Sequence, residues 1–82
     1  MKKYTQDNKL DKIICNKCGR ELNVEKQIPK EGVLSVRMAW GYFSKKDGQI
    51  HSFDLCEDCY DQWIKTFAVP VEKEEDTELL GI

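Results

Sequence analysis

The sequence contains no apolar stretch that approaches the ~20 residues required by a membrane-spanning helix, so we expect no membrane partner. Two lysines near the N-terminus are not followed by an apolar run, and a secretory signal peptide is therefore not expected. These absences favour a cytoplasmic protein, in which cysteine thiols stay reduced and seldom form disulfides.

Histidine occurs only once, at position 51, and no Ser/His/Asp, Cys/His or paired-carboxylate arrangement can be recognised around it. We therefore expect no enzymatic activity and no small-molecule substrate. His51 itself is interpreted as a surface or packing residue of a β-hairpin rather than as a base or a metal ligand.

A large excess of charge is also absent, because 13 Lys and Arg residues oppose 15 Asp and Glu residues. The resulting net charge of −2 disfavours double-stranded nucleic acid as a partner, since non-specific affinity comes from neutralising phosphates. The basic residues are nevertheless concentrated in residues 1–30, where eight Lys and Arg face four Asp and Glu. A nucleic-acid-binding regulator that uses this basic N-terminal third is therefore the alternative function.

The 82 residues suffice for one small domain with a marginal hydrophobic core. We expect a polar basic arm over residues 1–12, a globular domain over residues 13–69 and an acidic tail over residues 70–82. The apolar residues Leu79, Leu80 and Ile82 end this tail and are candidates for docking onto the domain. Domains of this size often need a metal or disulfides for stability, and four cysteines are present.

Alternating large apolar residues predict a strand over residues 34–42, and the Asp47-Gly48 dipeptide predicts the turn that follows. A second strand over residues 50–55 completes an antiparallel hairpin. A helix is expected to begin near the second cysteine pair and to end before Pro70, with Cys59, Trp63 and Phe67 on one face. Asp54 and Glu57 have the spacing of a capping box at its start. The expected fold class is small α+β.

The predicted first strand carries more large apolar side chains than one short helix can cover. The aromatic residues of the hairpin and helix could together form the core, which is the simplest interpretation. The other interpretation is an exposed apolar face that binds a protein partner or a second copy of the chain. On that interpretation the candidate partner-binding residues are Met38, Trp40 and Tyr42.

The strongest motif is a pair of C-x2-C sequences, Cys15 to Cys18 and Cys56 to Cys59. Two residues between cysteines allow both sulfurs to face one point, and two such pairs complete a tetrahedral zinc site. We therefore expect one structural Zn²⁺ per chain. Iron in the same thiolate site, thioredoxin-type redox chemistry and disulfides remain the alternatives.

Cys-Asn-Lys-Cys-Gly-Arg at residues 15–20 resembles the zinc knuckle that opens treble-clef zinc fingers. The segment of residues 53–60, followed by Trp63 and Ile64, resembles their closing part, in which a hairpin leads into a helix that carries two ligands. The resemblance implies a zinc-stabilised treble-clef-like domain, but such fingers serve many functions. The expected function is a small accessory or regulatory protein-interaction module without catalytic activity.

Overall fold

The computed structural model describes residues 1–76. These residues form small antiparallel sheets and one helix, which is the predicted α+β class. Within residues 1–76 no helix is long and apolar enough to cross a membrane. The elements in chain order are β1 (Lys2–Tyr4), β2 (Leu10–Ile14), β3 (Glu21–Leu22), β4 (Val24–Glu25), β5 (Ile28–Pro29), β6 (Val33–Ala39), β7 (Ile50–Cys56) and α1 (Glu57–Ile64).

The N-terminal residues form a hairpin rather than the expected irregular arm. β1 pairs antiparallel with β2, and β2 pairs with β3, so that Ile13 at the centre of this sheet is completely buried. A turn closed by the Asn8 N–H and the Thr5 carbonyl joins β1 to β2, with Asn8 in the left-handed region at φ 60°. Polar side chains suit β1 because it is an edge strand whose three residues are exposed, so its sequence has no apolar periodicity.

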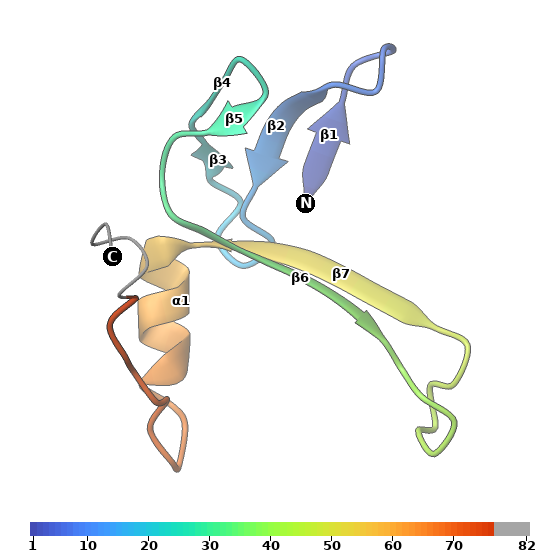
Figure 1. Cartoon of the computed structure of the whole chain (residues 1–82), viewed down its shortest axis with the longest axis vertical. Helices are drawn as coiled ribbons and strands as arrows, with labels where there is room; N and C mark the ends of the chain where they lie inside the picture. Colours follow the sequence, from blue (N-terminus) through green and yellow to red (C-terminus); the bar gives the residue numbers. More distant parts are fainter. Residues whose placement is uncertain (77–82) are drawn as a thin grey trace.

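β6 and β7 form the predicted antiparallel hairpin. The register runs from Val33 opposite Cys56 to Ala39 opposite Ile50. β6 ends three residues before the predicted Tyr42, because residues 41–48 form successive turns in which Gly48 has a φ of 90°. The outer half of this hairpin, residues 38–50, extends away from the rest of the molecule (Figure 1). We call it the arm.

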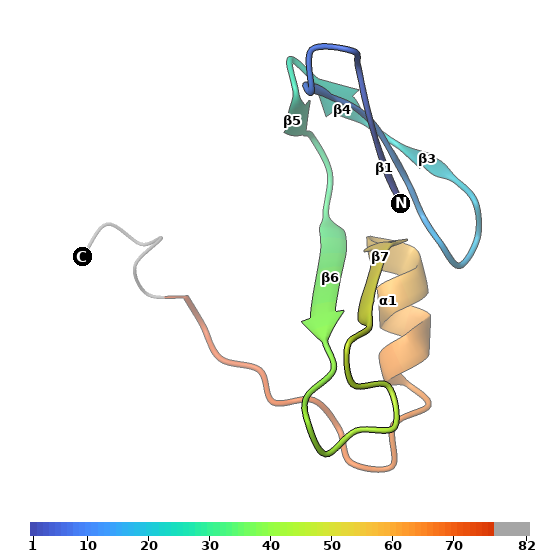
Figure 2. The same ribbon diagram turned by 90° about the vertical axis from the view of Figure 1, so that its right-hand side faces the viewer.

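The helix α1 is shorter than expected and starts differently. Its N-cap is Cys56 rather than Asp54, so the predicted capping box is wrong. The helix ends at Ile64 instead of continuing to Val69, because the Thr66 hydroxyl and N–H both donate to the Trp63 carbonyl. Figure 2 shows α1 alongside β7, with the N-terminal sheets at the other end of the molecule.

The two faces of the β6–β7 hairpin differ in polarity. Leu34, Leu55 and Phe53 belong to an apolar face, where the Phe53 ring lies 6.3 Å from the Trp63 ring of α1. Ser35 and Asp54 belong to the opposite, polar face, which β1 approaches through Lys2. The hairpin therefore separates an apolar side near the helix from a charged side near the N-terminus.

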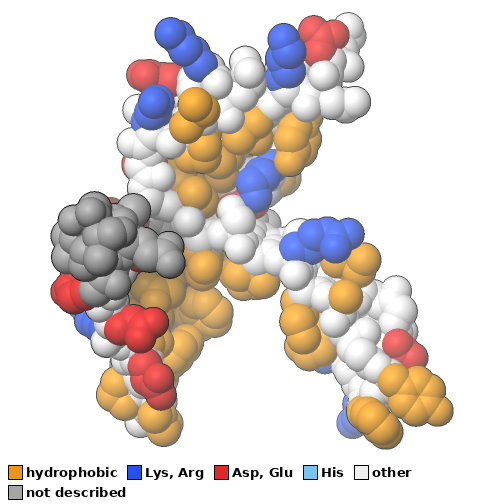
Figure 3. All heavy atoms as spheres, viewed as in Figure 1, with side chains coloured by type: hydrophobic (Ala, Val, Ile, Leu, Met, Phe, Trp, Pro, Cys, Tyr) orange, Lys and Arg blue, Asp and Glu red, His pale blue; other side chains and the backbone are white. Residues whose placement is uncertain are grey.

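The buried core is small and consists of aliphatic residues and cysteines rather than aromatic rings. At the tip of the arm, Tyr42 is 82% and Phe43 is 99% exposed, so the expected aromatic core is wrong for these residues. Figure 3 shows apolar atoms at the surface over the arm and beside α1. The buried apolar residues are Ile13, Cys15, Leu22, Leu55, Cys56 and Cys59.

Residues 72–76 of the acidic tail are exposed and have no regular secondary structure. The expected docking of Leu79, Leu80 and Ile82 concerns positions outside the described residues. The division into a polar basic segment over residues 1–12, a domain over residues 13–69 and a tail over residues 70–82 stays a prediction.

Candidate metal centre

The first cysteine pair lies in a tight loop between β2 and β3. The Cys15 N–H donates to the Arg20 carbonyl at 2.9 Å, and the Gly19 N–H donates to the Cys15 carbonyl at 2.8 Å. The Cys18 N–H points at the Cys15 Sγ at 3.5 Å. This loop needs a φ of 80° at Gly19, a conformation that glycine adopts without steric cost. Residues 15–20 therefore form a closed turn in which the Cys18 N–H points at the Cys15 sulfur.

The second pair lies where β7 passes into α1. Cys56 is the last residue of the strand and the N-cap of the helix, and Cys59 follows in the first turn. The free N–H groups of a helix N-terminus favour negative charge, so this position favours thiolates. A strand end and a first helical turn thus place both sulfurs toward the loop of the first pair.

The structure brings the four predicted ligand residues together in one cluster. Their Sγ atoms all lie within 4.8 Å of one another, and those of Cys18 and Cys56 are 3.9 Å apart. A tetrahedral site with metal–sulfur bonds of ~2.3 Å requires sulfur–sulfur distances of about 3.8 Å. Three of the cysteines are buried, only Cys18 is exposed, and all four are free thiols. The cluster is placed to bind one metal ion.

The thiols of the cluster cannot all ionise with equal ease. Burial alone raises the pKa of Cys15, but backbone N–H groups, that of Cys18 first, outweigh it and lower this pKa to about 6. The backbone N–H of Cys59 lowers the pKa of Cys56. The pKa of Cys59 is raised to about 12 by its contact with the Cys56 sulfur and by burial. A cation bound among the sulfurs removes this mutual repulsion and favours four thiolates.

A side chain inside the first C-x2-C motif connects the two cysteine pairs. The Asn16 N–H donates to the Asp54 carbonyl at 2.8 Å, and the Asp54 N–H donates to the Asn16 Oδ1 at 2.9 Å. Asn16 follows Cys15 directly and Asp54 stands two residues before Cys56. These two hydrogen bonds hold the loop of the first pair against the strand that carries the second pair.

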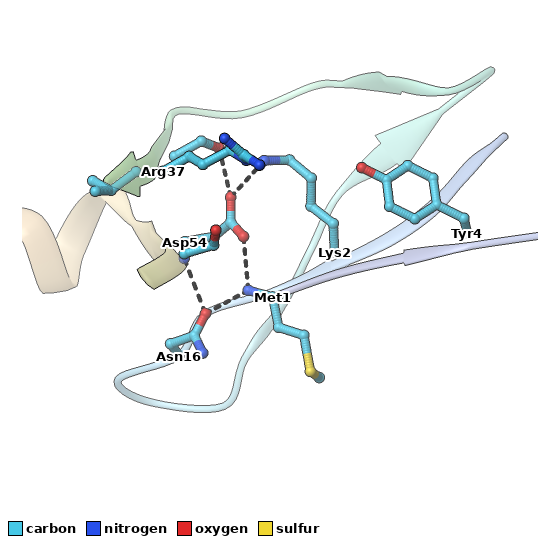
Figure 4. Close-up of a pocket in the computed structure, with 9 residues that line it drawn as sticks. Met1, Lys2, Tyr4, Asn16, Arg37 and Asp54 are labelled. Carbon is cyan, nitrogen blue, oxygen red and sulfur yellow. Dashed lines mark hydrogen bonds and ion pairs between the residues drawn. The ribbon is translucent and has the colours of Figure 1, made fainter. Parts of the chain in front are cut away.

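The Asp54 carboxylate, 4% exposed, is the one buried charged group among residues 1–76. It accepts hydrogen bonds from Lys2 Nζ at 2.9 Å and from Ser35 Oγ, and it pairs with the Met1 ammonium at 2.8 Å (Figure 4). Burial would raise the pKa of this carboxyl, but these partners outweigh burial and lower the pKa to about 2. The ionised carboxylate thus joins the N-terminus to both strands of the hairpin.

The sequence pattern does not single out Lys2, Asn16 or Asp54 as residues that connect these elements. Asn16 is the first residue inside the C-x2-C motif, but its hydrogen-bond partner lies 38 positions away. The spacing of Asp54 to Glu57 suggests a helix cap instead. The roles of these three residues follow from the packing of β1 and of the loop after β2 against the hairpin.

The candidate partner-binding residues lie outside the cysteine cluster, on the arm. Met38 is 46% exposed and Tyr42 is 82% exposed, whereas Trp40 is half-buried. The Trp40 ring lies 5.7 Å from the His51 ring, and Lys46 Nζ lies 4.6 Å from its centroid. His51 is exposed and contacts Trp40, as expected of a hairpin surface residue.

Comparison with protein-family models, with curated proteins and with solved structures finds no match for this chain.

Proposed function

We propose that the four cysteines bind one structural Zn²⁺ in a treble-clef-type domain. The sulfur cluster and the order of loop, hairpin and helix support this proposal. Zinc suits four thiolates in a closed tetrahedral shell, which leaves no open position for catalysis. The proposal therefore assigns the metal a stabilising role and assigns the protein no enzymatic activity.

Metal analysis of the purified chain is expected to give one zinc per chain. X-ray absorption should report four sulfur ligands at ~2.3 Å, because four thiolates complete the shell. The Cys18→Ser variant should replace one sulfur by a lighter ligand or lose the metal. Iron as the bound metal, two disulfides, or fewer than four sulfur ligands in the wild type would contradict the proposal.

We further propose that the domain acts as an accessory or regulatory protein-interaction module that presents the arm to a protein partner or a second copy. The exposure of Tyr42 and Phe43 at the arm tip carries this proposal. Their rings form an edge-to-face pair at 5.2 Å, so the tip presents two aromatic rings together. Exposed aromatic residues of this kind are typical of interaction sites. The proposed interaction surface therefore includes Phe43 together with Met38, Trp40 and Tyr42.

Replacing Tyr42 and Phe43 together by serine is expected to abolish self-association, or capture of the native partner, without loss of folding. Both side chains are almost fully exposed, so they contribute little to the core. Analytical ultracentrifugation and a pulldown from native cells, each with circular dichroism, measure the two effects. The Ile28→Ser variant removes an equally apolar residue from the other end of the molecule and serves as the control. A monomer at high concentration, together with capture unchanged by the double replacement, would contradict the proposal.

Nucleic-acid binding by the basic N-terminal third remains the alternative, and two contacts weaken it. Lys12 lies 3.6 Å from Glu21, and Arg20 lies 2.5 Å from Glu31. Carboxylates of the same chain therefore neutralise two of the cations that would contact a nucleic-acid backbone. Affinity for nucleic acid that falls steeply with salt would favour this alternative over the protein-interaction module.

A further inference from the structure

A pocket of about 430 Å³ lies between β1 and the polar face of the β6–β7 hairpin (Figure 4). It arises because β1 contacts the hairpin through the ends of its side chains rather than by backbone pairing. The pocket is lined by Met1, Lys2, Tyr4, Asn16, Ser35, Val36, Arg37, Ser52 and Asp54.

The strand register places the polar lining residues on one face. Ser35 stands opposite Asp54, and Arg37 stands opposite Ser52, so these two cross-strand pairs form adjacent rows. β1 contributes Lys2 from the other wall of the pocket. Figure 4 shows the side chains of Lys2 and Arg37 pointing toward each other across the pocket. Two cations and several hydroxyl groups therefore converge from separate elements.

The charges of the pocket do not balance. Asp54 supplies the single negative charge of the lining, whereas the Met1 ammonium, Lys2 and Arg37 supply three positive charges. The Arg37 side chain makes no hydrogen bond or ion pair with any residue of the described chain. The buried Asp54 holds the Met1 ammonium and Lys2 in place, so the pocket keeps an excess of two positive charges in a protein whose net charge is −2.

We propose that this pocket binds the phosphate group of a small phosphate monoester, with Arg37 and Lys2 as its cationic contacts. A phosphate monoester carries a charge of about −1.5 to −2 near neutral pH, which matches the excess. The guanidinium of Arg37 can donate two parallel hydrogen bonds to phosphate oxygens. The hydroxyls of Ser52 and Tyr4 line the same space and supply further donors.

The charge of a phosphate monoester distinguishes it from other anions that could enter the pocket. A carboxylate or the phosphodiester of a nucleic acid carries one negative charge and would leave half of the excess unmatched. The volume of about 430 Å³ also exceeds the need of a bare phosphate, which leaves room for the attached alcohol. The proposal does not depend on the identity of the metal or on a partner of the arm.

The test is an NMR titration of the full-length, metal-loaded chain with an unmodified N-terminus, because Met1 lines the pocket. Inorganic phosphate, ribose 5-phosphate, dimethyl phosphate and ribose are added separately just above neutral pH, with sodium chloride holding the ionic strength constant. We expect saturable shifts of the Lys2, Arg37 and Ser52 amides with the first two compounds. Dimethyl phosphate and ribose should produce no saturable shift in the same concentration range.

Variants identify the residues responsible. Arg37→Ala should weaken phosphate binding about tenfold, which is the effect of losing one charged hydrogen-bonding partner. The fold should be unchanged because the Arg37 side chain is exposed and has no partner within residues 1–76. Lys9→Ala removes the same charge outside the pocket and should leave the affinity unchanged. Equal shifts with chloride or dimethyl phosphate, or equal affinity of Arg37→Ala and wild type, would overturn the proposal. Tighter binding of ribose 5-phosphate than of inorganic phosphate would identify an ester as the ligand.

Discussion

Removal of the metal by a chelator, or replacement of Cys59 by serine, is expected to unfold most of residues 13–69. Within residues 1–76 the buried core contains six apolar residues, and three of them are cysteines of the cluster. Apparent binding energies of structural zinc in finger peptides are about 10–16 kcal/mol at neutral pH, more than a core of this size supplies. Circular dichroism and amide exchange before and after chelation measure the loss.

Two controls make this result specific to the cluster. Addition of one equivalent of zinc after chelation should restore the native spectrum. Asp58→Ser changes an exposed residue of the same helical turn and should leave the stability within about 0.5 kcal/mol of the wild type. A native spectrum and native amide protection after complete chelation would mean that the apolar core alone maintains the fold.

Replacement of Asp54 by asparagine is expected to lower the free energy of unfolding of the metal-loaded protein by about 2–4 kcal/mol. The substitution keeps the size of the side chain but removes the charge that holds the Met1 ammonium and Lys2. It also disturbs the strand segment that hydrogen-bonds with Asn16, so the affinity for metal should fall as well. Chemical denaturation and competition with a chromophoric chelator measure the two effects.

Glu21→Gln is the matched control, because Glu21 forms an exposed ion pair with Lys12. Exposed pairs contribute about 0–1 kcal/mol, so this variant should be nearly as stable as the wild type. Asn16→Ala should lower metal affinity while leaving the Asp54 ion pairs intact. If Asp54→Asn and Glu21→Gln had equal, small effects, the buried carboxylate would not be the connection between the N-terminus and the hairpin.

The strongest predictions from sequence were those carried by short-range patterns. The two C-x2-C motifs and Gly19 indicated a cluster of four cysteines. Two intervening residues and a glycine in the left-handed region determine where the sulfur atoms point. The alternating residues of β6 and the Asp47-Gly48 turn indicated the hairpin for the same local reason. By contrast, β1 carries no apolar periodicity, since it is an edge strand whose contacts with the hairpin are made by the polar side chain of Lys2.

The chain by itself therefore determined the four clustered cysteines, the hairpin and the approximate start of the helix. Only the tertiary structure decided what Asp54 does, because its role depends on Met1, Lys2 and Ser35, which lie far from it in sequence. It also decided that Tyr42 and Phe43 are exposed, since the turns after Ala39 carry them beyond the reach of the short helix. Apolar composition can predict which residues favour burial, but whether they are buried depends on which elements pack against them.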